Sequence, residues 1–317
     1  MALTEPRLFY KPFEYPQAFE FYKNQHRVHW LADEIPLASD LADWKGKLTE
    51  SEKNLVGNIL KSFAQTEVHV NDYWSTKVSA WFPKPEIQAA ARACADFESI
   101  HAESYFRLNE ELGLDNIVEF MEDPAISNKL ERLIETPGNT LEERALSLAI
   151  FSAFTEGVNL FSSFAILMSF QLRNLMKGTG QIVEYSVRDE SLHSQFGCWL
   201  FRILMEENPE LGSTKFTQSV YEACDLSVQL EFDFIDKAFE MGDIEGLSKT
   251  QLKNFIKERA NQKLTELGYN RLYNDIDPNM IKQMEWFGHL TSGKSHTDFF
   301  SSKVTEYSKS TADWSDL

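Results

Sequence analysis

The chain has 317 residues, and its 31 Lys and Arg against 49 Asp and Glu give a net charge of −18. With 43% hydrophobic and 25% charged residues, it is typical of a globular protein and too apolar for a disordered one. The acidity disfavours nucleic acid polymers and anionic membrane surfaces as partners. No apolar run approaches the roughly 18 residues of a membrane span, so we expect no transmembrane helix. The polar first 12 residues predict no signal peptide.

Scarce helix breakers predict an all-α protein with long helices. The chain has only 14 Gly and 10 Pro, and residues 58–82 and 86–112 contain neither. At about 1.5 Å per residue, these two stretches could form helices of roughly 37–40 Å. Residues 83–85 and 136–139 are typical of breaks between helices. Three capping boxes predict helix starts, at Thr49 with Glu52, Thr140 with Glu143, and Ser248 with Gln251.

The two ends of the chain differ from its middle. Residues 1–47 mix aromatic residues, prolines and charges, which predicts an irregular N-terminal arm packed on a helical body. Residues 301–317 are polar apart from four residues and predict a flexible tail. We therefore expect one helical domain, residues 1–300, followed by the tail, residues 301–317. The scattered cysteines, Cys94, Cys198 and Cys224, form no disulfide or zinc pattern and indicate free thiols in a reducing cytoplasm.

Two Glu-x-x-His pairs lie inside the long predicted helices. Glu98 precedes His101 by three residues, and Glu190 precedes His193 by three. Residues three apart share a helix face, so each pair can bind one metal ion or bridge two. Two such pairs, with one further Glu from each of two other helices, make up the ligand set of di-metal carboxylate four-helix bundles. The motif alone is weak, and its placement in helices poor in Gly and Pro strengthens it.

Glu67 and Glu156 supply the two further carboxylates. Glu67 shares a helix face with Phe63, Val70 and Trp74, and Glu156 with Leu160 and Phe164. A carboxylate on an apolar face is costly to bury without a partner, and the alternative is a solvated helix face. Four carboxylates and two neutral imidazoles would be electrically balanced by two divalent cations. Oxygen and imidazole ligands suit iron or manganese.

Tyr105 lies on the same face of its helix as the Glu98 and His101 pair. It follows Glu98 by seven residues and His101 by four. Its spacing alone also fits a core aromatic residue. Next to an oxidising metal pair, its phenol could lose an electron and a proton together.

Taken together, these residues resemble the small, radical-generating subunit of class I ribonucleotide reductase, a member of the ferritin-like superfamily. The resemblance rests on the six candidate ligands and their spacing, on residues 30–35 as a tryptophan motif, and on residues 299–307 as the segment leading to a tail tyrosine. It runs from about residue 20 to the C-terminus. It implies a ferritin-like helical bundle with a dinuclear metal site in the core.

The resemblance also implies a role for each residue. Glu67, Glu98 and His101 would bind one metal ion and Glu156, Glu190 and His193 the other, with Glu98 and Glu190 bridging. Tyr105 would hold the radical in a pocket lined by Leu160, Phe164 and Ser186. Asp189 would accept hydrogen bonds from His101 and Trp30. Trp30 and Tyr307 would pass the oxidising equivalent to the large subunit.

The implied function needs a second protein. The metal pair would activate oxygen and oxidise Tyr105, and the radical would pass to a cysteine of the large subunit, where ribonucleotides become deoxyribonucleotides. The chain itself has no convincing Gly-rich phosphate loop and no redox cysteine pair. The apolar residues of the tail, Trp314 and Leu317, fit docking to that subunit. A homodimer in the cytoplasm is also implied.

Glu67 departs from the family pattern, because much of the family has Asp at the first ligand position. Two iron ions are the leading expectation, and manganese–iron and two manganese ions are the alternatives. Two other kinds of protein are alternatives to the whole interpretation. One is another ferritin-like di-metal oxidase, such as a desaturase or a ligand-binding oxidase. The other is a non-catalytic iron-storing or scaffold protein. Trp30, Tyr105 and the tail with Tyr307 argue against the oxidase, which needs no long-range radical relay. Storage proteins normally have shorter chains without such a tail.

Overall fold

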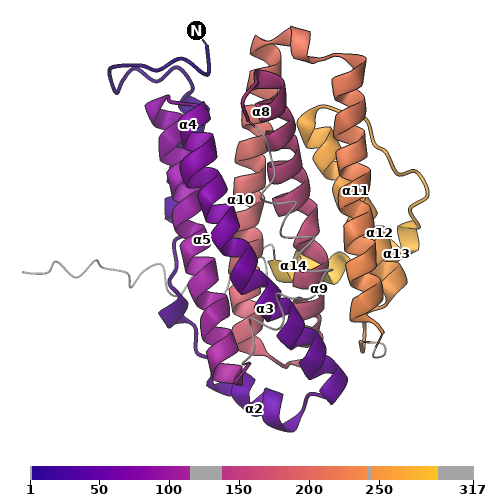
Figure 1. Cartoon of the computed structure of the whole chain (residues 1–317). Helices are drawn as coiled ribbons and strands as arrows, with labels where there is room; N and C mark the ends of the chain where they lie inside the picture. Colours follow the sequence, from indigo (N-terminus) through magenta and orange to yellow (C-terminus); the bar gives the residue numbers. More distant parts are fainter. Residues whose placement is uncertain (1, 115–137, 241–243, 292–317) are drawn as a thin grey trace, which may run out of the picture.

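The computed structural model describes residues 2–114, 138–240 and 244–291, and the regular elements named within these ranges are helices. Four long helical segments form the central bundle in Figure 1. They are α3 (Glu50–Asp72), α5 (Pro85–Leu112), the segment that begins with α8 (Leu141–Leu148), and α10 (Lys177–Glu207). α3 packs along α5, and α10 packs along the α8 segment. The all-α prediction is confirmed.

Capping side chains explain where three of the helices begin. Thr49, Thr140 and Ser248 each accept a hydrogen bond from the backbone N–H three residues on, and the Glu or Gln at that position bonds back. These boxes start α3, α8 and α12 (Lys249–Leu267), as the sequence predicts. α5 has Pro85 at its first position and is followed by the capping residue Gly113, whose φ of 67° favours glycine.

Two of the long helices contain π-helical stretches beside candidate ligands. η2 (Tyr73–Val78) continues α3 and leads into α4 (Ser79–Trp81). η3 (Ala149–Asn159) continues α8, includes Glu156, and leads into α9 (Phe161–Ser169) and η4 (Phe170–Arg173). π-Helical turns are rare and often lie at functional sites. Nothing in the residue pattern predicted them.

The helical segment from α8 to η4 is long and apolar enough, by composition, to cross a membrane. It spans Leu141–Arg173, and 94% of its most apolar 18-residue window is buried inside the protein. The sequence analysis did not identify this window. Its burial accounts for its composition, because a helix enclosed by protein on all sides is apolar all round.

The remaining helices cover the bundle. α11 (Thr214–Ala238) and α12 pack against η3, and η5 (Pro209–Leu211) joins α10 to α11. α13 (Pro278–Gln283) packs on α12, and α14 (Glu285–Thr291) on α9 and α10. Figure 1 places α11 and α12 on the side of the bundle away from α3 and α5.

The N-terminal arm is more regular than we predicted. Residues 1–47 include α1 (Pro16–Arg27), the 3₁₀ turn η1 (Ala32–Glu34) and α2 (Ala38–Gly46). α1 packs along α5 and also contacts α10, so its apolar side chains pack against the bundle. The prolines and charges of this segment obscured the helical pattern in the sequence. The helix is stabilised by its tertiary contacts. The predicted tail, residues 301–317, lies outside the described residues.

One buried carboxylate fastens the arm to the bundle. Glu86, in the first turn of α5, accepts hydrogen bonds from the backbone N–H groups of Glu14 and Tyr15 at 2.9 and 3.1 Å. The guanidinium of Arg7 pairs with the same carboxylate at 2.5 and 3.0 Å. Lys84 in turn pairs with the side chain of Glu14 at 2.6 Å. These contacts join residues 70 or more positions apart, and no local pattern indicates them.

Candidate metal centre

The structure brings the six predicted ligands together in the centre of the bundle. Glu67 comes from α3, Glu98 and His101 from α5, Glu156 from η3, and Glu190 and His193 from α10. Each of these side chains is at most 1% exposed. Four carboxylates at this depth need compensating positive charge.

The ligand atoms fall into two groups that share two carboxylates. Within each group, one potential ligand atom from every residue lies within 4.8 Å of the others. The first group is Glu67, Glu98, His101 and Glu190, and the second is Glu98, Glu156, Glu190 and His193. Glu98 and Glu190 belong to both groups, which is the arrangement that two bridging carboxylates require.

Several carboxylate and imidazole atoms of the cluster converge without forming hydrogen bonds to one another. Nδ1 of His193 lies 2.6 Å from Oε1 of Glu98, yet neither atom has a hydrogen-bond partner among the described residues. Both carboxylate oxygens of Glu190, and one oxygen each of Glu67 and Glu156, also lack such a partner there. Buried polar atoms are normally paired. Lone pairs that converge without pairing fit coordination of cations.

Burial and mutual repulsion shift the pKa values of the cluster when no cation is bound. Burial, then the charge of neighbouring carboxylates, raises the pKa values of Glu67, Glu156 and Glu190. Burial also disfavours the charged form of Glu98, but His193 and His101 outweigh it and lower the pKa of Glu98 to about 2. Four buried carboxylates therefore cannot all stay ionised without positive partners. Two divalent cations would supply the four positive charges.

Asp189 links His101 to Trp30, as the resemblance implies. Its Oδ2 accepts a hydrogen bond from the indole N–H of Trp30 at 2.8 Å and lies 3.3 Å from Nε2 of His101. Its Oδ1 accepts a bond from the buried amide of Gln25 at 3.2 Å. With Nε2 engaged by Asp189, Nδ1 of His101 faces Glu98 and Glu190 at 3.0 and 3.3 Å. A carboxylate behind a ligand histidine fixes the orientation of the ring in this way.

Tyr105 lies one helical turn after His101 and is completely buried. Its phenol donates a 2.8 Å hydrogen bond to Oγ of Ser186 on α10. Burial, reinforced by the charge of Glu67, raises the pKa of Tyr105 well above its usual value, so the phenol stays protonated. Oxidation of this phenol must therefore remove its proton together with the electron.

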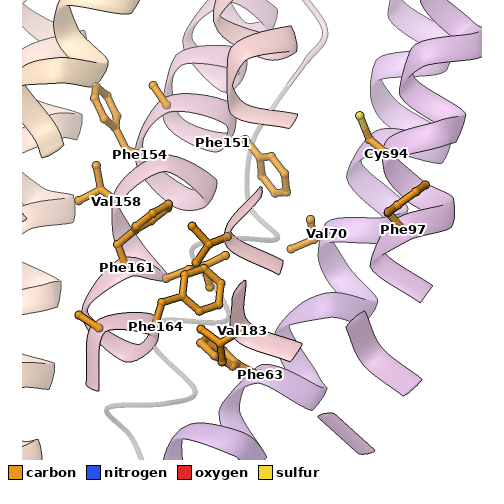
Figure 2. Close-up of a cluster of buried hydrophobic side chains, with 14 of the residues drawn as sticks. Phe63, Val70, Cys94, Phe97, Phe151, Phe154, Val158, Phe161, Phe164 and Val183 are labelled. Carbon is orange, nitrogen blue, oxygen red and sulfur yellow. The ribbon is translucent and has the colours of Figure 1, made fainter. Parts of the chain in front are cut away.

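An apolar shell separates Tyr105 from solvent. The ring of Phe63 lies 4.8 Å from that of Tyr105 and 5.1 Å from that of Phe164. Figure 2 shows Phe63, Phe164 and Val183 meeting between α3, α9 and α10. Leu160 is also buried. The structure thus places the predicted pocket residues, with Ser186, in the packed interior of the bundle.

Comparison with known proteins identifies the family. The model of the family described as "Ribonucleotide reductase, small chain" matches residues 7–279. The chain belongs to this family. It is 30% identical, over all of its own length and 99% of the relative, to an Invertebrate iridescent virus 6 protein named "Probable ribonucleoside-diphosphate reductase small subunit 376L". It is 29% identical to the Dictyostelium discoideum ribonucleoside-diphosphate reductase small subunit, over 94% of this chain and 85% of the relative.

Solved structures share the small-chain fold. The Streptococcus sanguinis protein named dimanganese(II)-NrdF superposes with a TM-score of 0.76 at 22% identity, covering 88% of this chain and 99% of that one. The R2 subunit of ribonucleotide reductase from Clostridium botulinum gives the same score at 20% identity, covering 88% and 89%. At this identity the likeness concerns the ferritin-like fold alone.

The chain is therefore an oxidoreductase subunit, the small subunit of ribonucleotide reductase, which works with a large subunit. The family and the buried cluster together indicate a dinuclear metal site. Of the predicted site residues, Tyr307 lies outside the described residues. The other nine lie in or directly against the cluster.

Trp74 is a member of the site whose role the sequence analysis missed. We named it only as an apolar neighbour of Glu67. Its indole N–H in fact donates a 2.5 Å hydrogen bond to Oε1 of Glu156. The sequence could have indicated this role, because a buried Trp on a helix face that carries a carboxylate needs an acceptor for its N–H.

Proposed function

We propose that this small subunit binds two redox-active metal ions and uses them to form a radical on Tyr105. The observation that carries the proposal is the sharing of Glu98 and Glu190 between the two ligand groups. When bound, the metal pair would supply the oxidising power, by activating oxygen. The protein side chains would hold the ions, keep water out, and control the electron and proton of the phenol.

Iron at both positions is our working assignment. Four carboxylates balance two divalent cations, and oxygen with imidazole ligands suits iron and manganese alike. Glu67, where much of the family has Asp, keeps manganese–iron and two manganese ions as alternatives. The dimanganese(II) protein of Streptococcus sanguinis has the same fold and supports considering manganese.

Tyr105 has the surroundings that a stored radical needs. Its hydroxyl donates a 2.8 Å hydrogen bond to Oγ of Ser186, and its ring packs on Phe63, which in turn packs on Phe164. This packing would keep reductants and water from quenching the radical. The phenol would release its proton along its hydrogen bond to Oγ of Ser186.

The route to the large subunit would begin at Trp30. The hydrogen bonds of Asp189 to Trp30 and to His101 offer a continuous connection from the centre to that indole. We propose that Tyr307 continues the route and that the tail, residues 301–317, docks to the large subunit. We also propose that the chain acts as a homodimer in the cytoplasm.

Metal analysis with electron paramagnetic resonance tests this function. Protein loaded with iron in air should contain about two metal ions per chain and show a radical signal. In Tyr105→Phe the signal should vanish while both metal ions remain, because the phenol is not a ligand. The same measurement on protein loaded with manganese, alone or with iron, distinguishes the three metal assignments. An unchanged signal in Tyr105→Phe would contradict the tyrosyl assignment, and absence of two metal ions would contradict the site.

A further inference from the structure

Trp74 is coupled to the side of the metal centre opposite Trp30. Trp30 reaches the group containing His101, through Asp189. Trp74 bonds directly to Glu156, which belongs only to the other group. The indole is fully buried, and its ring centroid lies 6.3 Å from that of His193. Each ligand group thus has its own tryptophan.

The hydrogen bond of Trp74 also makes the two oxygens of the Glu156 carboxylate different. Oε1 accepts the indole N–H, and Oε2 has no hydrogen-bond partner among the residues described. One oxygen is therefore held by Trp74, and the other remains for a cation. An electron removed from the indole would leave its N–H strongly acidic, and Oε1 lies in place to take up that proton.

A row of stacked rings continues from Trp74 toward the surface. The ring of Phe196 lies 5.5 Å from that of Trp74, with 30° between their planes. The ring of Trp199 lies 6.2 Å from that of Phe196, at 20°. Both pairs are within the range of packed aromatic contacts. The three residues come from η2 and α10, whose rigid backbones fix the spacing.

Trp199 ends this row at the surface. It is partly exposed and lines a groove of about 600 Å³ together with Phe21 of α1 and Arg202. The rings of Phe21 and Trp199 lie 5.9 Å apart. A small reductant in this groove would touch the indole of Trp199 without entering the bundle.

We propose that Trp74, Phe196 and Trp199 form a second path for single electrons, leading from this groove to the metal centre. The inference rests on the proposed function, because it needs an oxidisable metal pair. Trp74 gives one electron to the oxidised centre, while its N–H proton stays shared with Glu156. Trp199 then restores Trp74 through the ring of Phe196, and an external one-electron reductant restores Trp199. The donor loses one electron, the centre gains one, and both tryptophans return to their starting state.

The path gives the centre a connection that does not use the route to the large subunit. Phenylalanine is much harder to oxidise than tryptophan, so Phe196 acts as a bridge and the two indoles as relay stations. Replacement of either indole by a phenyl ring keeps most of the packing but removes a station. This makes Trp→Phe the informative substitution.

Anaerobic stopped-flow reduction tests the path. The oxidised, metal-loaded full chain is mixed with the methyl viologen radical cation, which the acidic surface attracts. Loss of viologen absorbance reports the rate. Trp199→Phe should slow this reduction by about tenfold, equal to about 1.4 kcal/mol of activation free energy. Trp74→Phe should slow it similarly, and the double variant no more than the slower single variant. Trp44→Phe, at a partly buried tryptophan within α2, is the matched control and should react like the parent chain.

Metal content is measured first in every variant, so that a failure of the metal site is seen separately from a failure of the path. The ring of Trp199 packs on Phe21 and Phe196, neither of which is a candidate ligand, so Trp199→Phe should keep both ions even if Trp74→Phe loses one. An unchanged reduction rate in Trp199→Phe would overturn the proposal. Slowing in Trp30→Phe alone would assign electron entry to Trp30 and overturn it too. Multiplied effects in the double variant would contradict a single path.

Discussion

Glu98 lies between the two histidines of the metal centre, and this position explains its unusual pKa. Both histidines lie within 3.0 Å of its carboxylate, one on each oxygen. Burial alone would raise its pKa, but the two imidazoles reverse the effect. Glu67 and Glu156 lie at the edges of the cluster, where burial and the neighbouring carboxylates raise their pKa values instead. Glu98 is therefore the carboxylate best placed to stay ionised and bridge two cations.

This difference predicts how metal content responds to substitution. Glu98→Gln should reduce metal content from about two ions per chain to below one, because both ligand groups lose a carboxylate. Glu67→Gln should leave about one ion, because Glu67 belongs to one group only. Metal analysis after dialysis measures both. Glu103→Gln, an exposed acid on the same helix as Glu98, should bind like the parent chain. Equal losses in the Glu67 and Glu98 variants would contradict the bridging geometry.

At the scale of elements, short sequence patterns predicted where helices begin, but they did not predict the π-helical stretches within them. The capping boxes at Thr49, Thr140 and Ser248 act within one helical turn, so the residues themselves predict them. The register of the six ligands also follows from spacing along each helix. The π-helical stretches η2 and η3 depend on how neighbouring helices pack, and α1 forms because α5 supports it. Glu86 has its partner Arg7 79 residues away, which no local pattern can indicate.

Glu86 yields a prediction about the N-terminal arm and pH. Burial tends to raise the pKa of Glu86, but bonds from Arg7 and from backbone N–H groups outweigh it and lower the pKa below 4.5. Such a carboxylate stabilises the folded state fully above its unfolded pKa, and the contribution is lost as pH falls through the lowered folded value. Glu86→Gln should therefore reduce the free energy of unfolding at pH 7 by about 1–3 kcal/mol. The gap from the parent chain should narrow below about pH 4.5.

Urea denaturation at several pH values measures this gap, and limited proteolysis reports release of the arm. Glu103→Gln again serves as the control, because its exposed carboxylate should contribute little at any pH. A gap between Glu86→Gln and the parent chain that stayed constant from pH 7 to pH 3 would show that packing, and not the charge of Glu86, holds the arm.

At the scale of the whole molecule, the net charge of −18 has two distinct parts. Most of the 49 acidic residues contribute to a surface that repels anions, but four carboxylates lie at the centre of the bundle. The composition alone could not distinguish the surface acids from the four buried carboxylates. The phase of Glu67, Glu98, Glu156 and Glu190 on their helices did so, because all four share faces with apolar residues. Two divalent cations would balance the formal charge of these four carboxylates and leave the surface charge unchanged.

The burial of these four carboxylates also predicts that metal ions stabilise the folded chain. The cluster is assembled from four helical segments and exists only in the folded state, so cations that bind it shift unfolding by mass action. At a metal concentration of about 100 times Kd, the gain is about 2.7 kcal/mol. For a chain of this size, that corresponds to a rise in Tm of about 4 °C. Calorimetry with and without a chelator measures the rise. Glu98→Gln, which should hold less than one ion per chain, separates the buried site from the acidic surface, because its Tm should rise much less with metal than that of the parent chain. An equal rise in that variant would place the stabilising cations on surface carboxylates.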